Sequence, residues 1–113
     1  WSQVGSNLHG KWGDNFGTSI SLNKDGKFIS VGSPHFSKGL TEVFQYVDGY
    51  WESIAYLAGE GSFDFSGNAT AISGNASIVG TSSIYNDGNG NDAGHVRIFK
   101  SDDVVPDDIP VTL

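Results

Sequence analysis

The stretch from Gly13 to Pro34, GDNFGTSISLNKDGKFISVGSP, decides the fold of this chain. Apolar residues alternate with Gly or Ser over Phe16–Leu22, which is the period of a β-strand with one buried face. A second apolar run, Lys27–Val31, follows the turn sequence Asn-Lys-Asp-Gly, and Asp-Gly between two such runs indicates a hairpin. The stretch therefore predicts two antiparallel strands.

The chain repeats this hairpin, in altered form, from Phe63 to Ser82. Three pairs of residues share an offset of 50 positions: Trp1 with Trp51, Asp14 with Asp64, and Gly17 with Gly67. After the turn the glycines predict an offset of 48, with Gly26 matching Gly74 and Gly32 matching Gly80, as if the second turn had lost two residues. Insertions and deletions that fall in turns are typical of a structural repeat.

A second matching segment lies further along the chain, where Gly39–Phe44 resembles Gly94–Phe99 at an offset of 55. The pattern predicts four strands in the first repeat, at residues 16–22, 27–31, 40–47 and 50–57. It predicts three strands in the second repeat, at residues 67–72, 76–80 and 94–100. Residues 1–12 read like the fourth strand of a further repeat, so the expected units are residues 1–12, 13–59, 60–100 and an extended acidic, proline-containing tail at 101–113.

Composition sets the class of protein. Helix signals are nearly absent and Gly occurs 16 times, which favours an all-β, antiparallel fold of short strands. The net charge of −7 and a single arginine, Arg97, argue against binding to nucleic acid, and no apolar run is long enough for a membrane span. Cysteine is absent, which excludes disulfides. Because the sequence opens on Trp1 and lacks Met, we expect a processed or excised segment whose signal peptide is not visible.

The motif GDNFG at Gly13–Gly17, followed by Gly32-Ser33-Pro34, resembles the FG-GAP repeat, with Ser33 in place of the usual Ala. The second copy departs further, since Phe65-Ser66-Gly67 replaces Phe-Gly. The resemblance covers residues 1–100 and implies about two four-stranded propeller blades of the integrin-α type, the second lacking its fourth strand. It also implies an extracellular or cell-surface location and a role in binding or adhesion.

Motifs for catalysis are missing from the sequence. There is no nucleophile elbow, phosphate-binding loop or His-Glu-x-x-His zinc motif. The three histidines, His9, His35 and His95, are scattered over separate segments without the spacing of metal ligands. We therefore predict a protein that is not an enzyme; a hydrolase whose catalytic residues lie outside this segment is the least favoured alternative.

A loop rich in Asn and Gly, residues 85–94, is the best candidate for a cation site. Asp87, Asn89 and Asn91 place oxygen ligands at alternate positions, which suits Ca²⁺. These three residues match the first three ligand positions of the calcium loop in integrin-type blades. Asp92 stands where that loop has a glycine, and His95 stands where it has its last acidic residue. With fewer carboxylates the predicted affinity is weak, and an ordinary Asn/Gly hairpin turn explains the same residues.

Two sequons, Asn68-Ala-Thr and Asn75-Ala-Ser, make Asn68 and Asn75 candidate N-glycosylation sites. Asn75 is the better candidate because it falls in a predicted turn. Several large aromatic residues fit either a carbohydrate- or protein-binding platform or packing between blades. They are Trp1, Trp12, Tyr46, Tyr50, Trp51 and Tyr56.

Two blades are too few to close a propeller, so the sequence predicts contacts with other protein units. One hypothesis is head-to-tail strand exchange, in which the N-terminal strand of one molecule, with Trp1, Val4 and Leu8, pairs with the segment of another that carries Val96 and Ile98. This would make the chain a structural subunit of a ring or filament. The alternative is that neighbouring blades belong to the same longer polypeptide.

Overall fold

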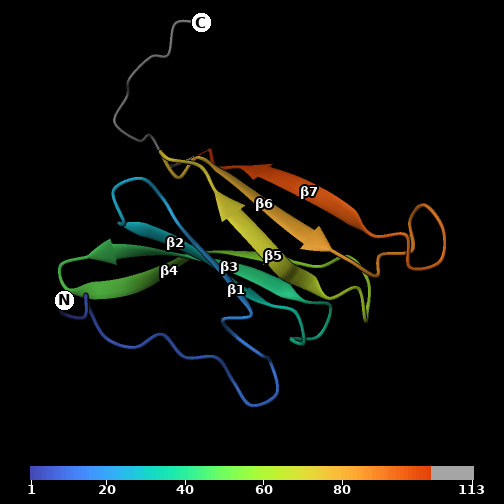
Figure 1. Ribbon diagram of the computed structural model, residues 1–113, viewed down its shortest axis with the longest axis horizontal. Helices are drawn as coiled ribbons and strands as arrows, with labels where there is room; N and C mark the ends of the chain where they lie inside the picture. Colours follow the sequence, from blue (N-terminus) through green and yellow to red (C-terminus); the bar gives the residue numbers. More distant parts are fainter. Residues whose placement is uncertain (103–113) are drawn as a thin grey trace, which may run out of the picture.

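The computed structural model describes residues 1–102 and confirms an all-β, antiparallel fold (Figure 1). The first sheet has the order β1 (Ser19–Leu22), β2 (Phe28–Ser33), β3 (Leu40–Val47), β4 (Tyr50–Ala58). The second sheet has the order β5 (Ser66–Ile72), β6 (Ile78–Ser83), β7 (His95–Lys100). Neither sheet closes into a barrel. In the described part of the chain, no helix is long and apolar enough to cross a membrane.

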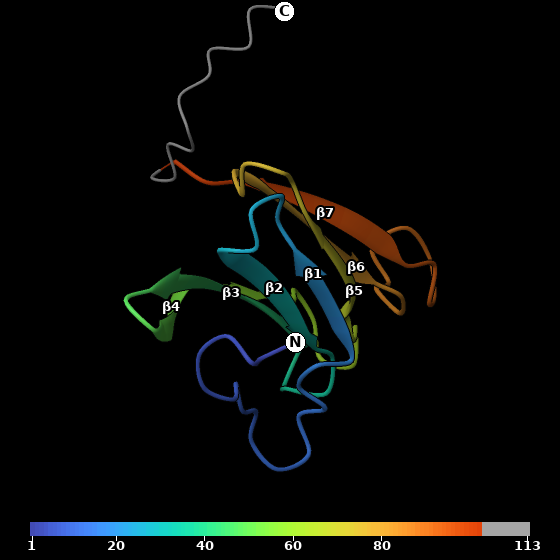
Figure 2. The same cartoon turned by 60° about the vertical axis from the view of Figure 1, so that its left-hand side comes forward.

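The two sheets pack side by side, with β5 lying against β1 and β2 (Figure 2). Hydroxyl groups dominate this contact. Thr41 and Thr81 share a buried hydrogen bond of 2.8 Å between their Oγ1 atoms, and the Thr70 hydroxyl donates to Ser30 Oγ at 3.1 Å. Because these bonds pair buried hydroxyls across the contact, they help to fix how the sheets are placed relative to each other.

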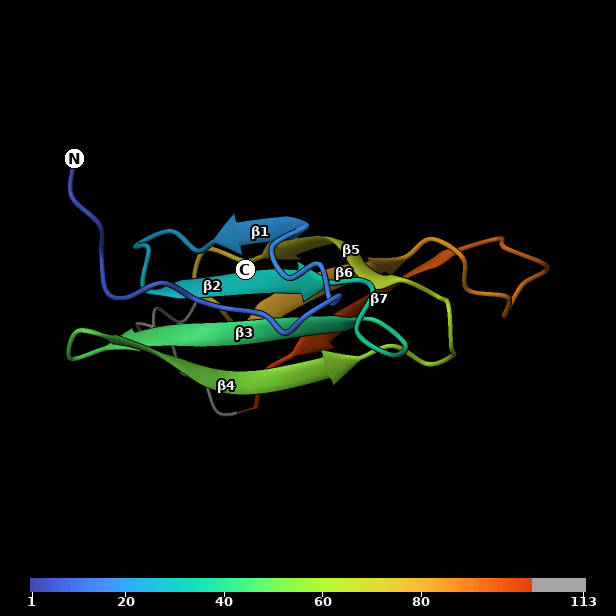
Figure 3. The same cartoon turned by 90° about the horizontal axis from the view of Figure 1, so that it is seen from below.

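The apolar core lies on both sides of this polar layer and consists of Val31, Leu40, Val43, Phe44, Ala76 and Val79. Residues 1–18 form no strand and run across the first sheet (Figure 3). The indole N–H of Trp51 donates to the Val4 carbonyl at 3.0 Å, and the Phe16 ring packs edge-on against Phe44. The N-terminal segment thus covers one face of the first sheet, and its pairing with another blade stays a prediction.

The turns of the two repeats have the same length, so the predicted change of offset from 50 to 48 is wrong. The Asn23 N–H donates to the Phe28 carbonyl at 3.0 Å, and the Ser73 N–H donates to the Ile78 carbonyl at 2.8 Å, again 50 residues on. Ala76, with φ of 64°, takes the left-handed position that Gly26 fills in the first turn with φ of 74°. Matching glycine to glycine was misleading because an alanine adopts the strained conformation. As a result β6 begins at Ile78 rather than at residue 76.

The segments that lead into β1 and β5 share three left-handed residues, again 50 positions apart. The φ angles of Asn15 and Phe65 are 56° and 57°, and those of Gly17 and Gly67 are 92° and 91°. In the first repeat the regular strand begins only after these residues, so β1 begins at Ser19 instead of at Phe16, whereas β5 begins at Ser66 and contains Gly67. The sheets approach closely at Gly32, where an added Cβ atom would clash with the Gly67 carbonyl oxygen.

Candidate functional site

Three loops meet at one end of the two sheets: residues 34–39 after β2, residues 59–65 between β4 and β5, and residues 84–94 after β6. Backbone hydrogen bonds join them. The Gly59 N–H donates to the Gly39 carbonyl at 2.9 Å, and the Tyr85 N–H donates to the Asp64 carbonyl at 3.2 Å. This loop end therefore brings together residues from both repeats.

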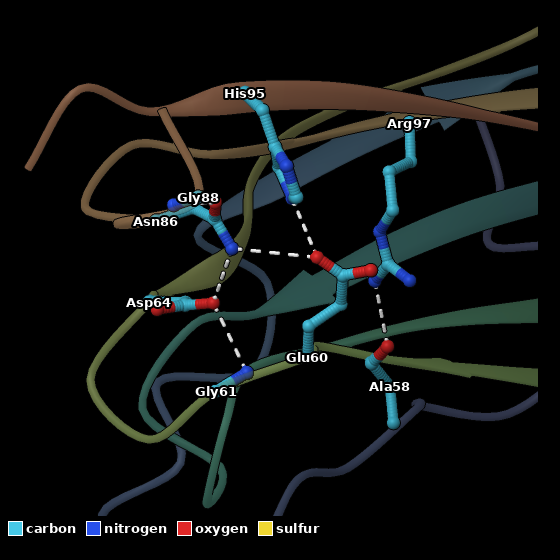
Figure 4. Close-up of polar contacts among 8 residues, drawn as sticks. All are labelled: Ala58, Glu60, Gly61, Asp64, Asn86, Gly88, His95 and Arg97. Atoms are coloured by element: carbon cyan, nitrogen blue, oxygen red, sulfur yellow. Dashed lines mark hydrogen bonds and ion pairs between the residues drawn. The ribbon is translucent and has the colours of Figure 1, made fainter. Parts of the chain in front are cut away.

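Asp64 anchors the loop end, and only 5% of its surface is exposed (Figure 4). Its Oδ2 accepts hydrogen bonds from the Gly61 N–H at 3.0 Å and from the Asn86 side-chain amide at 2.8 Å. The Asn86 Oδ1 in turn accepts the Gly88 N–H at 2.8 Å. A buried carboxylate with these partners is a structural tie between the loops at 59–65 and 84–94.

Glu60 and His95 flank this tie (Figure 4). His95 Nε2 lies 3.6 Å from Glu60 Oε1, which is an ion-pair distance but too long for a hydrogen bond, and Asn86 Nδ2 lies 3.4 Å from the same oxygen. The Glu60 side chain is 56% exposed, so solvent screens the pair strongly. The structure therefore places His95 beside Glu60. In the comparison with the calcium loop, His95 stood at the position of the last acidic ligand.

Arg97 joins the second sheet to the first at the same end. Its Nη2 donates to the Ala58 carbonyl at the end of β4 over 2.7 Å, and its guanidinium carbon lies 5.0 Å from the centre of the Phe99 ring. The hydrogen bond to Ala58 links the two sheets, whereas the ring contact lies within β7. The only arginine of the chain therefore serves packing between the sheets.

An aromatic row runs across the loop end and was not foreseen from the sequence. The rings of His35 and Phe65 stack at 5.0 Å with an interplanar angle of 10°, and Phe65 meets Tyr85 at 5.2 Å and 62°. His35 and Tyr85 are exposed and hold matching places 50 residues apart, since the His35 N–H donates to the Asp14 carbonyl just as that of Tyr85 does to Asp64. The repeat offset was the one signal that could have paired these two residues.

The candidate cation loop forms turns. Asp87, Asn89, Asn91 and Asp92 are all exposed, and Asp87 Oδ1 accepts the Asp92 N–H at 2.7 Å. Across residues 1–102, no three His, Cys, Asp or Glu side chains gather as a metal ion would require. Amide and backbone oxygens also bind Ca²⁺, so calcium binding by this loop stays a prediction.

Both sequon asparagines are exposed. Asn75 lies in the β5–β6 turn, where its Oδ1 accepts hydrogen bonds from the Ser77 N–H and from the hydroxyls of Ser73 and Ser77. Asn68 lies within β5, at an irregularity in the pairing with β6. Their glycosylation stays a prediction.

The residues predicted to take part in assembly lie in separate parts of the structure, the N-terminal segment and β7. Val4 contacts the first sheet through Trp51, and Leu8 belongs to the same N-terminal segment, whereas Val96 and Ile98 project from β7 and are 65% and 66% exposed. Of the predicted aromatic platform, Trp51 packs against Tyr46 at 5.2 Å. The other members are exposed: Trp1, Trp12, Tyr50 and Tyr56.

The sequence was compared with protein-family models and with curated proteins. No family model matches the chain, and no curated protein matches it either. The functional assignment therefore depends on the loop end itself.

Proposed function

We propose that this chain is a non-catalytic, propeller-type repeat module that acts in binding or adhesion outside the cell. The observation that carries the proposal is the aromatic row His35–Phe65–Tyr85 at the loop end. Its members come from three loops and both repeats, so the row exists only when the two sheets are packed together. The resemblance to FG-GAP blades supports the same role.

The row suits recognition of a carbohydrate or of a protein surface. Exposed aromatic rings offer apolar area with little loss of conformational entropy, and the ring of His35 adds a hydrogen-bonding group. The backbone beneath the row is held by the Asp64–Asn86 hydrogen bond at 2.8 Å. A ligand would therefore meet a surface that is already ordered, which lowers the entropic cost of binding.

Binding can be tested with the labelled chain on arrays of immobilised glycans and extracellular proteins, followed by titration of each ligand that binds. We expect Tyr85→Ala to weaken binding by about tenfold or more, because it removes one exposed ring of the row. The matched control is Tyr50→Ala, since Tyr50 is 71% exposed but lies at the opposite end of the β3–β4 hairpin. We expect this control to bind like the unaltered chain.

Two results would contradict the proposal. Equal losses of affinity in Tyr85→Ala and Tyr50→Ala would show that the ligand does not bind at the aromatic row. A folded chain that binds no member of either array would contradict a binding role. Circular dichroism of each variant shows whether the fold is kept.

A structural subunit that assembles by strand exchange is the second candidate. It is favoured by β7, which pairs only with β6 in the described residues and leaves one edge of its sheet open. Such a subunit forms larger particles as its concentration rises, which light scattering detects, whereas the binding module stays monomeric.

A further inference from the structure

Two serine hydroxyls lie between the sheets without a hydrogen-bond partner within residues 1–102. Ser66 of β5 and Ser83 of β6 are both 0% exposed, and the Oγ atom of each is buried and unpaired. Buried hydroxyls are nearly always paired, because a hydroxyl that leaves water without a replacement raises the free energy of the folded state. These two atoms therefore need a partner.

The two hydroxyls face the same space. Ser66 and Ser83 are cross-strand neighbours, so their side chains lie on the same side of the second sheet. Ser83 is two positions from Thr81, which bonds to Thr41, so this side faces the first sheet. The Cβ atoms of such neighbours are about 5 Å apart. One small hydrogen-bonding molecule can therefore contact both Oγ atoms.

A third unpaired atom continues the row onto β7. His95 is the cross-strand neighbour of Ser83, and its Nε2 is buried without a hydrogen-bond partner in the described chain. This atom points toward Glu60 Oε1, which is 3.6 Å away and beyond hydrogen-bond reach (Figure 4). Arg97 Nε, two positions further along β7, is also buried and unpaired. The serine–histidine row, Ser66–Ser83–His95, thus crosses all three strands of the second sheet.

Two loops seal this row from solvent at Ser66. An added Cβ atom on Gly39 would clash with the Ser66 backbone, and one on Gly59 would lie 2.9 Å from the Ser66 Cβ. The backbone of both loops therefore passes too close to Ser66 for a larger residue. Because bulk solvent does not reach the Ser66 hydroxyl, a partner for it has to be held inside the protein.

We propose that the serine–histidine row is a binding site for internal water, in which a water molecule bridges Ser66 Oγ and Ser83 Oγ and the hydrogen bonds continue to His95 Nε2. A buried water molecule typically makes about three hydrogen bonds to polar groups that lack other partners, and the row offers three such groups. This site goes beyond the binding function above and does not depend on it.

Water fits the chemistry of the row better than a metal ion does. The row contains two hydroxyls and one ring nitrogen but no carboxylate. Within residues 1–102, no three His, Cys, Asp or Glu side chains gather as metal ligands. Serine hydroxyls both donate and accept, so a water molecule can donate to one serine and accept from the other.

The matching positions of the first sheet are mainly apolar. The offsets between the repeats place Phe16, Ser33 and Leu40 where the second sheet has the serine–histidine row. The Phe16 ring packs against another ring, and Leu40 belongs to the apolar core. Ser33 is 2% exposed, but its partner on β3 is Leu40 instead of a polar residue. Ser33 therefore provides a matched control.

The water site also bears on the loop end. Ser66 directly follows Phe65 in the chain, and Ser83 precedes Tyr85 by two positions. A water molecule that bridges the two serines links β5 and β6 close to the loops that carry these two rings. It therefore adds to the order of the loop end without touching the aromatic row.

Alanine variants distinguish bridged hydroxyls from unpaired ones by the sign of the effect. We expect Ser66→Ala and Ser83→Ala each to lower the folding equilibrium constant by about fivefold, because each removes a hydrogen bond of the bridging water. The double variant should lose less than the product of the two factors, since the water is released once either serine is gone. Ser33→Ala should change the constant by less than about twofold. Urea unfolding measures all four variants.

A crystal structure of the unaltered full chain provides the direct readout. We expect a water molecule about 2.7–3.0 Å from both Oγ atoms. Unchanged or raised folding equilibrium constants in Ser66→Ala and Ser83→Ala overturn the proposal, because removal of an unpaired hydroxyl relieves its desolvation penalty. A direct hydrogen bond between the two serines in the crystal also overturns it. So does a metal ion at this place, which is recognised by oxygen distances below about 2.6 Å.

Discussion

The first and second sheets share a backbone plan but differ in how they meet their neighbours. Position 32 of the first sheet is a glycine, which lets the Gly67 carbonyl enter. The matching position of the second sheet is Ser82, whose Oγ accepts the Ala69 N–H at 3.0 Å within its own sheet. Hydrogen bonds and left-handed residues recur every 50 positions, yet the packing surfaces do not. The residue at this one position therefore differs between the sheets at the point where the first sheet receives the second.

Adding a methyl group at Gly32 should break this contact. We expect Gly32→Ala to lower the free energy of unfolding by about 3 kcal/mol or more, because the new Cβ overlaps backbone atoms of β5 and the strands must shift to make room for it. For a domain of this size the melting temperature should fall by more than about 10 °C. Urea unfolding followed by tryptophan fluorescence measures the change.

The matched control is Ser82→Ala, which alters the equivalent place in the second sheet. It removes one partly exposed hydrogen bond to Ala69, so a loss of about 1 kcal/mol or less is expected. Similar losses of stability in Gly32→Ala and Ser82→Ala would show that the close contact at Gly32 does not make position 32 more sensitive than position 82.

A smaller difference separates Asp64 from its repeat partner Asp14. The buried Asp64 carboxylate accepts two hydrogen bonds, whereas the half-buried side chain of Asp14 makes none within residues 1–102. We expect Asp64→Ala to cost about 2 kcal/mol, because Asn86 and Gly61 lose their acceptor. Asp14→Ala should cost less than about 0.5 kcal/mol. Thermal unfolding compares the two variants, and equal losses would refute the role of Asp64 as a tie between loops.

The strands were predictable because they depend on local patterns. Alternation of apolar residues and the turn sequences located the seven strands of the described residues to within a few residues, and the equal offset of Asp14 and Asp64 indicated the repeat. The position of β6 was missed by two to three residues, because Ala76 adopts a conformation usually reserved for glycine. Strain that tertiary packing imposes on an alanine leaves no mark in the sequence.

The loop end was much less predictable. Its contacts join residues far apart in the sequence, such as His35 with Phe65 and Asp64 with Asn86, across loops of different length. Composition drew attention to exposed oxygens in the loop at 85–94, whereas the ordered feature is the aromatic row, to which this loop contributes Tyr85. The spacing within one loop says little about which other loop lies next to it.

The two hairpin turns should differ in how their contribution to stability depends on pH, and this is the smallest effect that we expect. Asp25 and Asn75 hold equivalent places, and each accepts the N–H of the residue two positions on, Lys27 or Ser77, at 3.0 Å. The hydrogen bond from Lys27 lowers the pKa of the Asp25 carboxyl below its ordinary value of 3.8. Asn75 does not titrate. Only the first turn should therefore respond to acid.

The sign of this response follows from the lowered pKa. The ionised form of Asp25 stabilises the folded state above the ordinary carboxyl pKa, and this contribution is lost as the pH falls through the lower folded value. Between about pH 5 and about pH 2.5, Asp25→Asn should flatten the decline of the melting temperature, whereas Asn75→Asp should steepen it. Because Asp25 is fully exposed, both changes should be small. A steeper decline in Asp25→Asn, or no change in either variant, would show that the two turns do not differ in this way.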